Sequence, residues 1–193
     1  IADPDINAIY NPLPNGLHGR WTIAALEAGK HVLCEKPFTA NASEAEAVAA
    51  VARAHPSQVT MEAFHYRYHA LTARMLEIIA SGELGKVEHI ETWFCIPLPV
   101  KDIRWDLSLA GGSLMDTGCY AVHILRTLAG AEPTVRSAKI KLHSPNVDRF
   151  TEAQVTFADG RTGAITTSMW STRLLSIGAR VRGSDATMIV NNP

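Results

Sequence analysis

The chain has 193 residues, of which 47% are hydrophobic and 19% are charged, and this composition excludes disorder as a description of the whole chain. Its 18 basic and 19 acidic residues give a net charge of −1 without a run of like charge, which excludes the electrostatic surface of a nucleic-acid or membrane-surface binder. No apolar stretch approaches the roughly 20 residues that a membrane-spanning helix needs. We therefore expect no nucleic-acid partner and no membrane partner.

The cysteine content argues against a disulfide framework. Cys34, Cys95 and Cys119 are odd in number and widely spaced, without a CxxC pair, and none has the basic neighbours typical of a reactive thiolate. The sequence begins Ile-Ala-Asp-Pro rather than with methionine. We therefore expect the natural start to lie upstream, and this beginning says nothing about a signal peptide. We expect a cytoplasmic location.

The first third of the chain alternates between predicted strands and helices. The first β-prone run stops at residues 12–16, where two prolines and a glycine end regular pairing. The first helix ends at Gly29, a favourable C-cap position, and Ser43 with Glu46 forms a capping box that opens the second. The order strand, helix, strand predicts a βαβ unit with parallel strands. The predicted strands cover 7–11, 31–34 and 59–64, and the predicted helices run from Gly19 to Gly29 and from Ser43 to the stop at Pro56.

After about residue 65 the pattern changes from alternation to a run of strands. An amphipathic helix ends at Ser81-Gly82, and a later helix is closed by Gly130. Asp159-Gly160 between two β-prone runs is a strong hairpin signal. The predicted helices cover 70–80 and 113–128, and the predicted strands cover 87–96, 135–142, 153–157, 162–169, 175–181 and 187–190.

This order predicts two domains, an α/β domain over 1–65 and an α+β domain with a mostly antiparallel sheet over 66–193. So few parallel strands leave an uncovered face and a long edge, so we expect further sequence upstream of the first domain. The chain also ends Asn-Asn-Pro directly after a strand, so we expect the second domain to be truncated at its C-terminus.

Glu35-Lys36-Pro37 stands where the second predicted strand ends. Ligands of open α/β sheets bind at this edge, and Pro37 favours an extended backbone at Lys36 that continues the strand. A lone lysine at a strand end is most often only a solvated charge, and that reading stays open at this point.

A second candidate segment runs from Gly111-Gly112 to Tyr120. Asp116 and Tyr120 are four residues apart and so share one face of the predicted helix. The other reading is a half-buried tyrosine in the core with Asp116 near the helix N-terminus, where its charge is favoured.

Together these segments resemble the Gfo/Idh/MocA family of nicotinamide-dependent oxidoreductases. The resemblance covers essentially the whole chain and implies a Rossmann domain that binds NAD or NADP, here present in part. An α/β domain follows, with a large open sheet that carries the substrate pocket on one face and commonly a subunit interface on the other. The pieces that carry it, in the family's order, are 10–15 with His18, 28–37, Phe64 with Arg67-Tyr68, 82–86, and Gly111 to Tyr120.

The resemblance assigns roles to individual residues. Lys36 matches the family's catalytic lysine, and Asp116 and Tyr120 match its Asp-x-x-x-His/Tyr pair. Tyrosine at the second position is similar to the branch with glucose-fructose oxidoreductase, NADP-dependent xylose dehydrogenase and dihydrodiol dehydrogenase. The implied cofactor-binding residues are Asn11, Pro12, Pro14, Asn15, His18, Glu35, Lys36 and Pro37, and the implied substrate-binding residues are Phe64, Arg67, Arg104, Trp105, Asp116 and Tyr120.

One departure from the family pattern concerns the cofactor. The N-terminal Gly-x-Gly-x-x-Gly, whose backbone amides receive the pyrophosphate at a helix N-terminus, is absent, and Gly16 and Gly19 do not fit it. The residue that separates NAD from NADP belongs to the same missing stretch. We therefore assign the activity to the complete parent protein.

The chemistry of the matched residues suits alcohol oxidation, which needs a base for the hydroxyl proton and a cation for the developing alkoxide. Tyr120 can be the base and Lys36 the cation, since a nearby ammonium lowers the pKa of a phenol. Asp116 would orient the substrate or Lys36. The expectation is an enzyme that transfers a hydride between NAD or NADP and a secondary alcohol or carbonyl of a sugar, polyol or cyclic diol, and that forms a homo-oligomer through its C-terminal sheet.

Two other functions fit parts of the sequence. A non-catalytic nucleotide-sensing or regulatory protein of the same fold would need no acid-base pair. A metal hydrolase would use histidines such as His65 and His69, but no acidic partner completes an HExxH pattern, so we expect no metal site. His123 follows Tyr120 by three residues and either approaches the pocket or packs in the core.

Overall fold

The computed structural model describes residues 1–172 and 174–191. Contacts divide the chain into two compact units. The first unit contains Ile1–Phe64 and Asp106–Gly111, and the second contains His65–Trp105 and the chain from Gly112 onward. The expected domain boundary between residues 65 and 66 stays a prediction, and the contacts place the short segment Asp106–Gly111 with the first unit.

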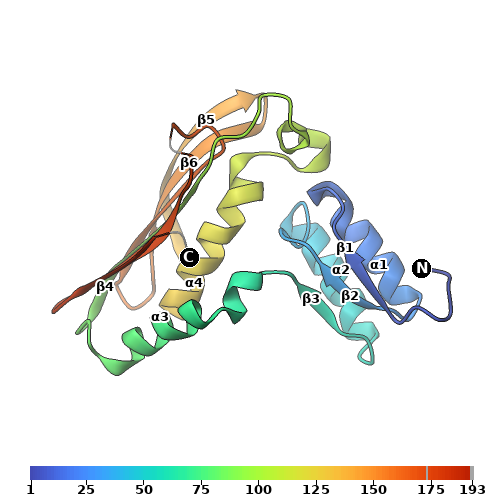
Figure 1. Ribbon diagram of the computed structural model, residues 1–193, viewed down its shortest axis with the longest axis horizontal. Helices are drawn as coiled ribbons and strands as arrows, with labels where there is room; N and C mark the ends of the chain where they lie inside the picture. Colours follow the sequence, from blue (N-terminus) through green and yellow to red (C-terminus); the bar gives the residue numbers. More distant parts are fainter. Residues whose placement is uncertain (173, 192–193) are drawn as a thin grey trace. The chain divides into compact units, whose positions relative to one another are not determined.

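The first unit is built on a parallel sheet whose described strands lie in the order β1-β2-β3. Two helices connect these strands and pack against each other (Figure 1). Ala25, Leu26, Val32 and Cys34 form the buried core between helix and sheet. The elements are β1 (Ala8–Asn11), α1 (His18–Glu27), β2 (His31–Cys34), α2 (Ala42–Ala54) and β3 (Thr60–Glu62), with a short 3₁₀ helix, η1 (Asn15–Leu17), before α1.

The observed ends of α1 and α2 can be compared with the C-cap and the capping box predicted from the sequence. Gly29 follows α1 with φ of +75°, the left-handed conformation expected at a helix end. The predicted capping box at Ser43 and Glu46 is wrong. The N-cap is Asn41, whose side chain accepts from the backbone N–H of Glu44 (2.9 Å), while the Glu44 carboxylate accepts from the N–H of Ala40 (2.7 Å). A reciprocal pattern of the predicted kind therefore exists between Asn41 and Glu44, two residues before Ser43 and Glu46.

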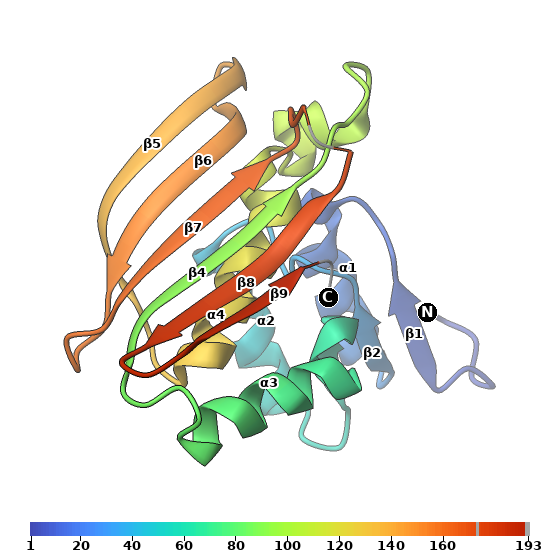
Figure 2. The same cartoon turned by 60° about the vertical axis from the view of Figure 1, so that its left-hand side comes forward.

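The second unit is built on a large open sheet, which within the described residues has six strands in the order β5-β6-β7-β4-β8-β9 (Figure 2). Among these strands β4 and β7 pair in parallel, and the other neighbours are antiparallel. The mostly antiparallel sheet is therefore confirmed. The strands are β4 (Val87–Cys95), β5 (Thr134–Ser144), β6 (Val147–Thr156), β7 (Thr162–Ser168), β8 (Ser176–Gly183) and β9 (Thr187–Asn191).

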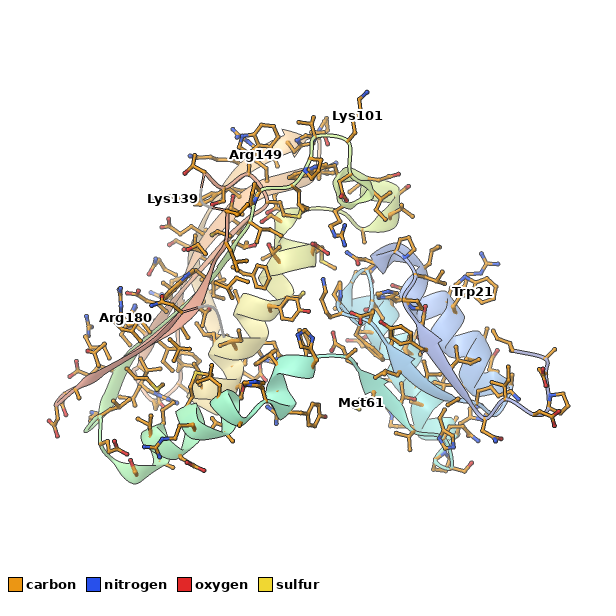
Figure 3. The ribbon with its side chains drawn as sticks, in the orientation of Figure 1. Trp21, Met61, Lys101, Lys139, Arg149 and Arg180 are labelled. Carbon is orange, nitrogen blue, oxygen red and sulfur yellow. The ribbon has the colours of Figure 1, made fainter. Side chains whose placement is uncertain are left out.

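Helix α4 (Cys119–Ala129) packs on one face of the large sheet over β4 and β7. The Thr92 hydroxyl on β4 donates to the carbonyl oxygen of Ala121 at 2.8 Å, in a buried position that fixes the helix to the strand. Because side chains alternate along a strand, Glu91 and Trp93 belong to the opposite face, which we call the open face. Figure 3 shows Lys139 and Arg180 on the side of the sheet away from α4.

The second unit also contains helix α3 (Ala70–Ser81) and shorter helical turns. Helix α3 follows the 3₁₀ helix η2 (His65–Tyr68), and two further 3₁₀ turns are η3 (Ile103–Trp105) in this unit and η4 (Leu107–Leu109) in the first. Among residues 1–172 and 174–191, no helix combines the length and apolar character needed to cross a membrane.

Two predicted elements differ from the observed ones by more than small shifts of their ends. The predicted helix over 113–128 begins with a π-helix, η5 (Leu114–Gly118), before α4. Strand β6 begins at Val147 rather than at residue 153, because its first half pairs with β5 and, from Phe150 onward, also with β7. The charged residues of this half hide the strand in the sequence.

Candidate active site

The carboxyl end of β2 carries Glu35 and Lys36. The backbone N–H of Glu35 donates to the carbonyl oxygen of Asn11 at 3.0 Å, which continues the pairing beyond the strand. The Glu35 carboxylate accepts from the Tyr10 hydroxyl at 2.8 Å and from the N–H of Lys36 at 3.2 Å, and the Tyr10 hydrogen bond raises the pKa of that tyrosine. The Lys36–Pro37 peptide bond is cis. Lys36 therefore stands two residues beyond the strand end, in a backbone held by its neighbours.

His18 joins two segments that flank this strand end. The side chain is buried, and its Nδ1 lies 2.7 Å from the carbonyl oxygen of Pro37 while its Nε2 lies 2.6 Å from that of Leu13. Asn11 Nδ2 donates to the His18 carbonyl oxygen at 3.1 Å and to Thr22 Oγ1 at 3.2 Å. Three predicted cofactor-binding residues, Asn11, His18 and Pro37, are thus linked by hydrogen bonds.

Asn15 contacts the segment Asp106–Gly111. Its Nδ2 donates to the carbonyl oxygen of Ala110 at 3.3 Å, and a Cβ at Gly16 would lie only 3.0 Å from the Leu109 backbone. The loop between the two prolines and α1 and the segment before the glycine pair are therefore packed together within the first unit. Pro12 is exposed, and Pro14 precedes η1 as its N-cap.

The helical segment that carries Asp116 and Tyr120 is fixed at its start by Asp148 on β6. The backbone N–H of Leu114 lies 3.1 and 3.0 Å from the two Asp148 carboxylate oxygens, and the Thr151 hydroxyl donates to one of them at 2.7 Å. Gly112 has φ of +120°, and a Cβ there would lie 2.6 Å from the Asp148 carboxylate. The second glycine of the pair is therefore required by both conformation and space.

Buried hydroxyls hold the same segment against β7. Thr167 Oγ1 lies 2.8 Å from Ser113 Oγ and within hydrogen-bond distance of Thr117 Oγ1. Thr117 also donates to the carbonyl oxygen of Ser113 at 2.8 Å. These bonds accompany the π-helical turn, a local departure from α-helix that is frequent at functional sites.

Asp116 is buried and forms an ion pair within the second unit. Its Oδ2 lies 3.2 Å from Arg104 Nε, and Arg104 Nη1 lies 3.2 Å from Asp102 Oδ1. Burial lowers the pKa of Arg104, but the Asp116 charge and the contacts with Asp102 outweigh it and raise the pKa overall. Two predicted site residues, Arg104 and Asp116, are brought together here in a pair that the sequence analysis did not foresee.

Tyr120 lines a cavity of about 150 Å³ on the helix-covered face of the large sheet. Its ring stacks on Phe94 with centroids 5.1 Å apart and planes at 21°. The His65 and Tyr66 rings lie 6.1 and 6.2 Å from it. The lining residues are His65, Tyr66, Phe94, Tyr120, Ile124 and Ile177. The phenol thus stands in a small, mainly aromatic pocket.

Tyr66, which lines this cavity, also contacts His123. The Tyr66 Oη and His123 Nδ1 atoms lie 2.5 Å apart, within hydrogen-bond distance. Burial first, and then the charges of Arg67 and Arg126, lower the pKa of His123 to about 4, so the ring is neutral at pH 7. In the tautomer that carries its proton on Nε2, the Nδ1 atom accepts from the Tyr66 hydroxyl. His123 also lines a second cavity of about 580 Å³ with Arg67, Arg126 and Glu132.

The other predicted substrate residues have structural partners. Phe64 is buried at the end of the first unit. Trp105 is buried, donates from Nε1 to the carbonyl oxygen of Pro99 at 2.8 Å and stacks on His143 with centroids 4.3 Å apart. Arg67 lies at the second cavity beside His123 rather than among the residues that line the Tyr120 pocket.

In the part of the chain that the structure describes, no three His, Cys, Asp or Glu side chains gather to hold a metal ion. His65 faces the Tyr120 ring, and His69 Nδ1 accepts from the backbone N–H of Leu71 at the start of α3. No disulfide joins Cys34, Cys95 and Cys119, all of which are described.

Lys36 belongs to the first unit, and Asp116 and Tyr120 belong to the second. The approach of the lysine to the phenol therefore stays a prediction. Sequence reasoning missed Tyr66 and Asp148 as residues of the candidate site. Tyr66 lies between Phe64 and Arg67, two residues that carry the family resemblance. Its spacing gave no sign of a contact with His123, which follows 57 residues later.

A parallel βαβ unit with a lysine at a strand end, followed by an open sheet with a tyrosine-bearing helix on one face, defines a class of two-part α/β oxidoreductases. Comparison with family models agrees: residues 72–189 match the GFO/IDH/MocA C-terminal domain, and residues 1–63 match the oxidoreductase family with NAD-binding Rossmann fold. The chain belongs to the Gfo/Idh/MocA family.

Two curated proteins are similar to this chain in sequence. The chain is 43% identical over 171 residues to D-xylose 1-dehydrogenase (NADP(+)) 2 of Haloferax volcanii, covering 87% of this chain and 52% of that protein. Over 127 residues it is 40% identical to dTDP-3,4-didehydro-2,6-dideoxy-alpha-D-glucose 3-reductase of Saccharopolyspora spinosa, covering 65% of this chain and 38% of that protein. The chain spans about half or less of the length of these curated relatives.

Solved structures show the same fold. The 3-ketoreductase KijD10 from Actinomadura kijaniata, in complex with TDP-benzene and NADP, has a TM-score of 0.86 at 29% identity, covering 98% of this chain and 57% of that one. Levoglucosan dehydrogenase in complex with NADH and levoglucosan has a TM-score of 0.88 at 26% identity, covering 98% and 55%.

Proposed function

We propose that the complete polypeptide carrying this sequence is an NAD- or NADP-dependent oxidoreductase. It transfers a hydride between the nicotinamide and a secondary alcohol or carbonyl of a sugar, polyol or cyclic diol. The observation that carries the proposal is Tyr120, a phenol in an aromatic cavity, which the sequence resemblance assigns to the family's acid-base position. The names of the relatives, a xylose dehydrogenase and a dTDP-sugar reductase, support a sugar-like substrate.

The first unit offers a chemical fit for the nicotinamide nucleotide, which supplies the hydride chemistry when bound. Asn11, at the carboxyl end of β1, is 3% exposed, and its Oδ1 has no hydrogen-bond partner among the described residues. A buried acceptor of this kind is normally satisfied, so a donor from a bound group suits it. We propose that the nucleotide is held by Asn11, Pro12, Pro14, Asn15, His18, Glu35, Lys36 and Pro37.

In this proposal Tyr120 and Lys36 act on one carbinol group. The Tyr120 oxygen takes the hydroxyl proton during oxidation, and the Lys36 ammonium stabilises the oxygen as it becomes negative. The same ammonium lowers the pKa of the phenol. Asp116 orients the substrate from its ion pair with Arg104, and the remaining substrate contacts come from Phe64, Arg67 and Trp105.

We also propose a homo-oligomer that forms through the open face of the large sheet. This face carries the exposed Ile189 and the ion pair between Arg180 Nη1 and Glu91 Oε2 at 2.8 Å, beside Trp93. Apolar and paired charged groups on one surface suit a contact between copies. Light scattering coupled to size exclusion should give a multiple of the monomer mass, and Ile189→Lys should reduce this mass.

We also propose a cytoplasmic location, where cysteines stay reduced, as Cys34, Cys95 and Cys119 are in this structure.

The test of the enzymatic proposal is kinetic. Lys36→Met and Tyr120→Phe should each lower kcat by about 10²-fold or more, since positioned acid-base groups contribute roughly 10² to 10⁴. Lys101→Met in an exposed loop and Tyr68→Phe on an exposed ring are matched controls that keep activity. Retention of activity in both test variants would end the proposal. Nucleotide binding without turnover of any sugar, polyol or diol would favour the sensing protein instead.

A further inference from the structure

Tyr66 and His123 connect two cavities of the second unit. Tyr66 lines the 150 Å³ cavity together with Tyr120, and His123 lines the 580 Å³ cavity beside the C-terminal half of α4. The hydrogen bond between Tyr66 Oη and His123 Nδ1 spans the wall between them. The Tyr66 backbone is anchored as well, because its carbonyl oxygen accepts from the Thr72 hydroxyl at 2.7 Å.

Two arginine charges lie near this pair. His123 faces Arg67 from η2 and Arg126 from its own helix, and Arg126 is paired with Glu132. The two arginine charges oppose the accumulation of a proton on the imidazole, and water in the cavity that His123 lines can take a proton from the ring. The cavity shared by Tyr66 and Tyr120 has room for a bridging water, which occupies about 30 Å³.

We propose that Tyr66 and His123 form the path by which the proton released in alcohol oxidation travels from Tyr120 to solvent. The inference rests on the proposed function of Tyr120. Both residues are positioning residues that act through Tyr120, and the second cavity is the exit of the path.

Each step moves one proton and no electron. The Tyr120 hydroxyl, having taken the substrate proton, gives it through water to the Tyr66 oxygen. The Tyr66 hydroxyl proton passes to His123 Nδ1, and the Nε2 proton of the imidazole passes to water in the larger cavity. Tautomer exchange in the neutral ring restores the starting form. The net result is one proton in solvent for each hydride transferred to the nucleotide.

The experiment follows both products in a single turnover of the complete polypeptide with bound nucleotide. Stopped-flow absorbance reports NAD(P)H, and a pH indicator reports the proton. In the wild type the two signals should rise together. His123→Asn keeps an acceptor for the Tyr66 hydroxyl but cannot pass a proton through a ring. We expect its proton signal to lag NAD(P)H by about tenfold or more, the lower range of acid-base contributions, and Tyr66→Phe should show the same lag.

Controls separate the path from packing. His89→Asn, on the large sheet and hydrogen-bonded to Thr162, should keep the two signals together. Imidazole added as a small buffer should shorten the lag of His123→Asn. Synchronous signals in both Tyr66→Phe and His123→Asn, or a lag that no buffer shortens, would overturn the proton path alone. Absence of NAD(P)H formation by the wild type would overturn the proposed function and the path with it.

Discussion

Removing the Asp148 carboxylate should loosen the start of the helical segment that carries Asp116 and Tyr120. The carboxylate accepts from the Leu114 N–H at 3.0 to 3.1 Å and from the Thr151 hydroxyl at 2.7 Å. Loss of a helix cap costs about 1 kcal/mol, and loss of the second hydrogen bond costs about 1 kcal/mol more. Asp148→Ala should therefore lower the free energy of unfolding by about 2 kcal/mol.

Thermal unfolding followed by circular dichroism measures this change. At roughly 2 to 4 °C per kcal/mol for a chain of this size, Asp148→Ala should lower Tm by about 4 to 8 °C. Asp148→Asn keeps one acceptor oxygen and should lose about half as much. Gly112→Ala places a Cβ 2.6 Å from this carboxylate, so its cost should be smaller in the Asp148→Ala background. An unchanged Tm in Asp148→Ala, or additive costs of the two substitutions, would refute the reasoning.

The remaining predictions concern three other side chains. Lys30 is 8% exposed and its Nζ donates to two backbone carbonyl oxygens of the turn at 3–6, at 2.8 and 2.6 Å, so Lys30→Met should make that turn exchange its amide hydrogens faster. Arg104→Met leaves the buried Asp116 charge without this ion pair and should lower kcat, while Arg104→Lys should recover part of it. The pKa of His123 is lowered to about 4, so on acidification the unfolded chain takes up a proton at this ring before the folded chain does. The free energy of unfolding should therefore fall as pH drops from about 6.5 toward 4. Urea titrations at several pH values should show a smaller dependence of this free energy on pH in His123→Asn.

Local signals in the sequence specified most of the fold. Strand and helix order, the helix ends at Gly29 and Gly130 and the hairpin at Asp159-Gly160 depend on periodicity and on backbone conformations that few residues adopt. The position of Lys36 beyond β2 followed from the strand prediction alone.

Contacts between distant residues could not be predicted in this way. The pairs Arg104 with Asp116, Tyr66 with His123 and Gly112 with Asp148 join different elements, and no spacing in one sequence encodes them. The π-helical turn at Leu114–Gly118 also depends on tertiary contacts, because the hydroxyls of Ser113 and Thr117 lie within hydrogen-bond distance of Thr167 on β7. The capping box is different, because it is a local signal: the pattern at Ser43 and Glu46 competed with the one at Asn41 and Glu44, which the structure uses.

A double-mutant cycle on kcat/KM for Lys36→Met and Tyr120→Phe tests most directly whether one ammonium and one phenol serve the same reacting group. Groups that act as a unit are strongly non-additive, so the account predicts a double variant about as slow as the slower single variant. A double variant slowed by the full product of the two single effects would show that the residues act independently and would contradict the account.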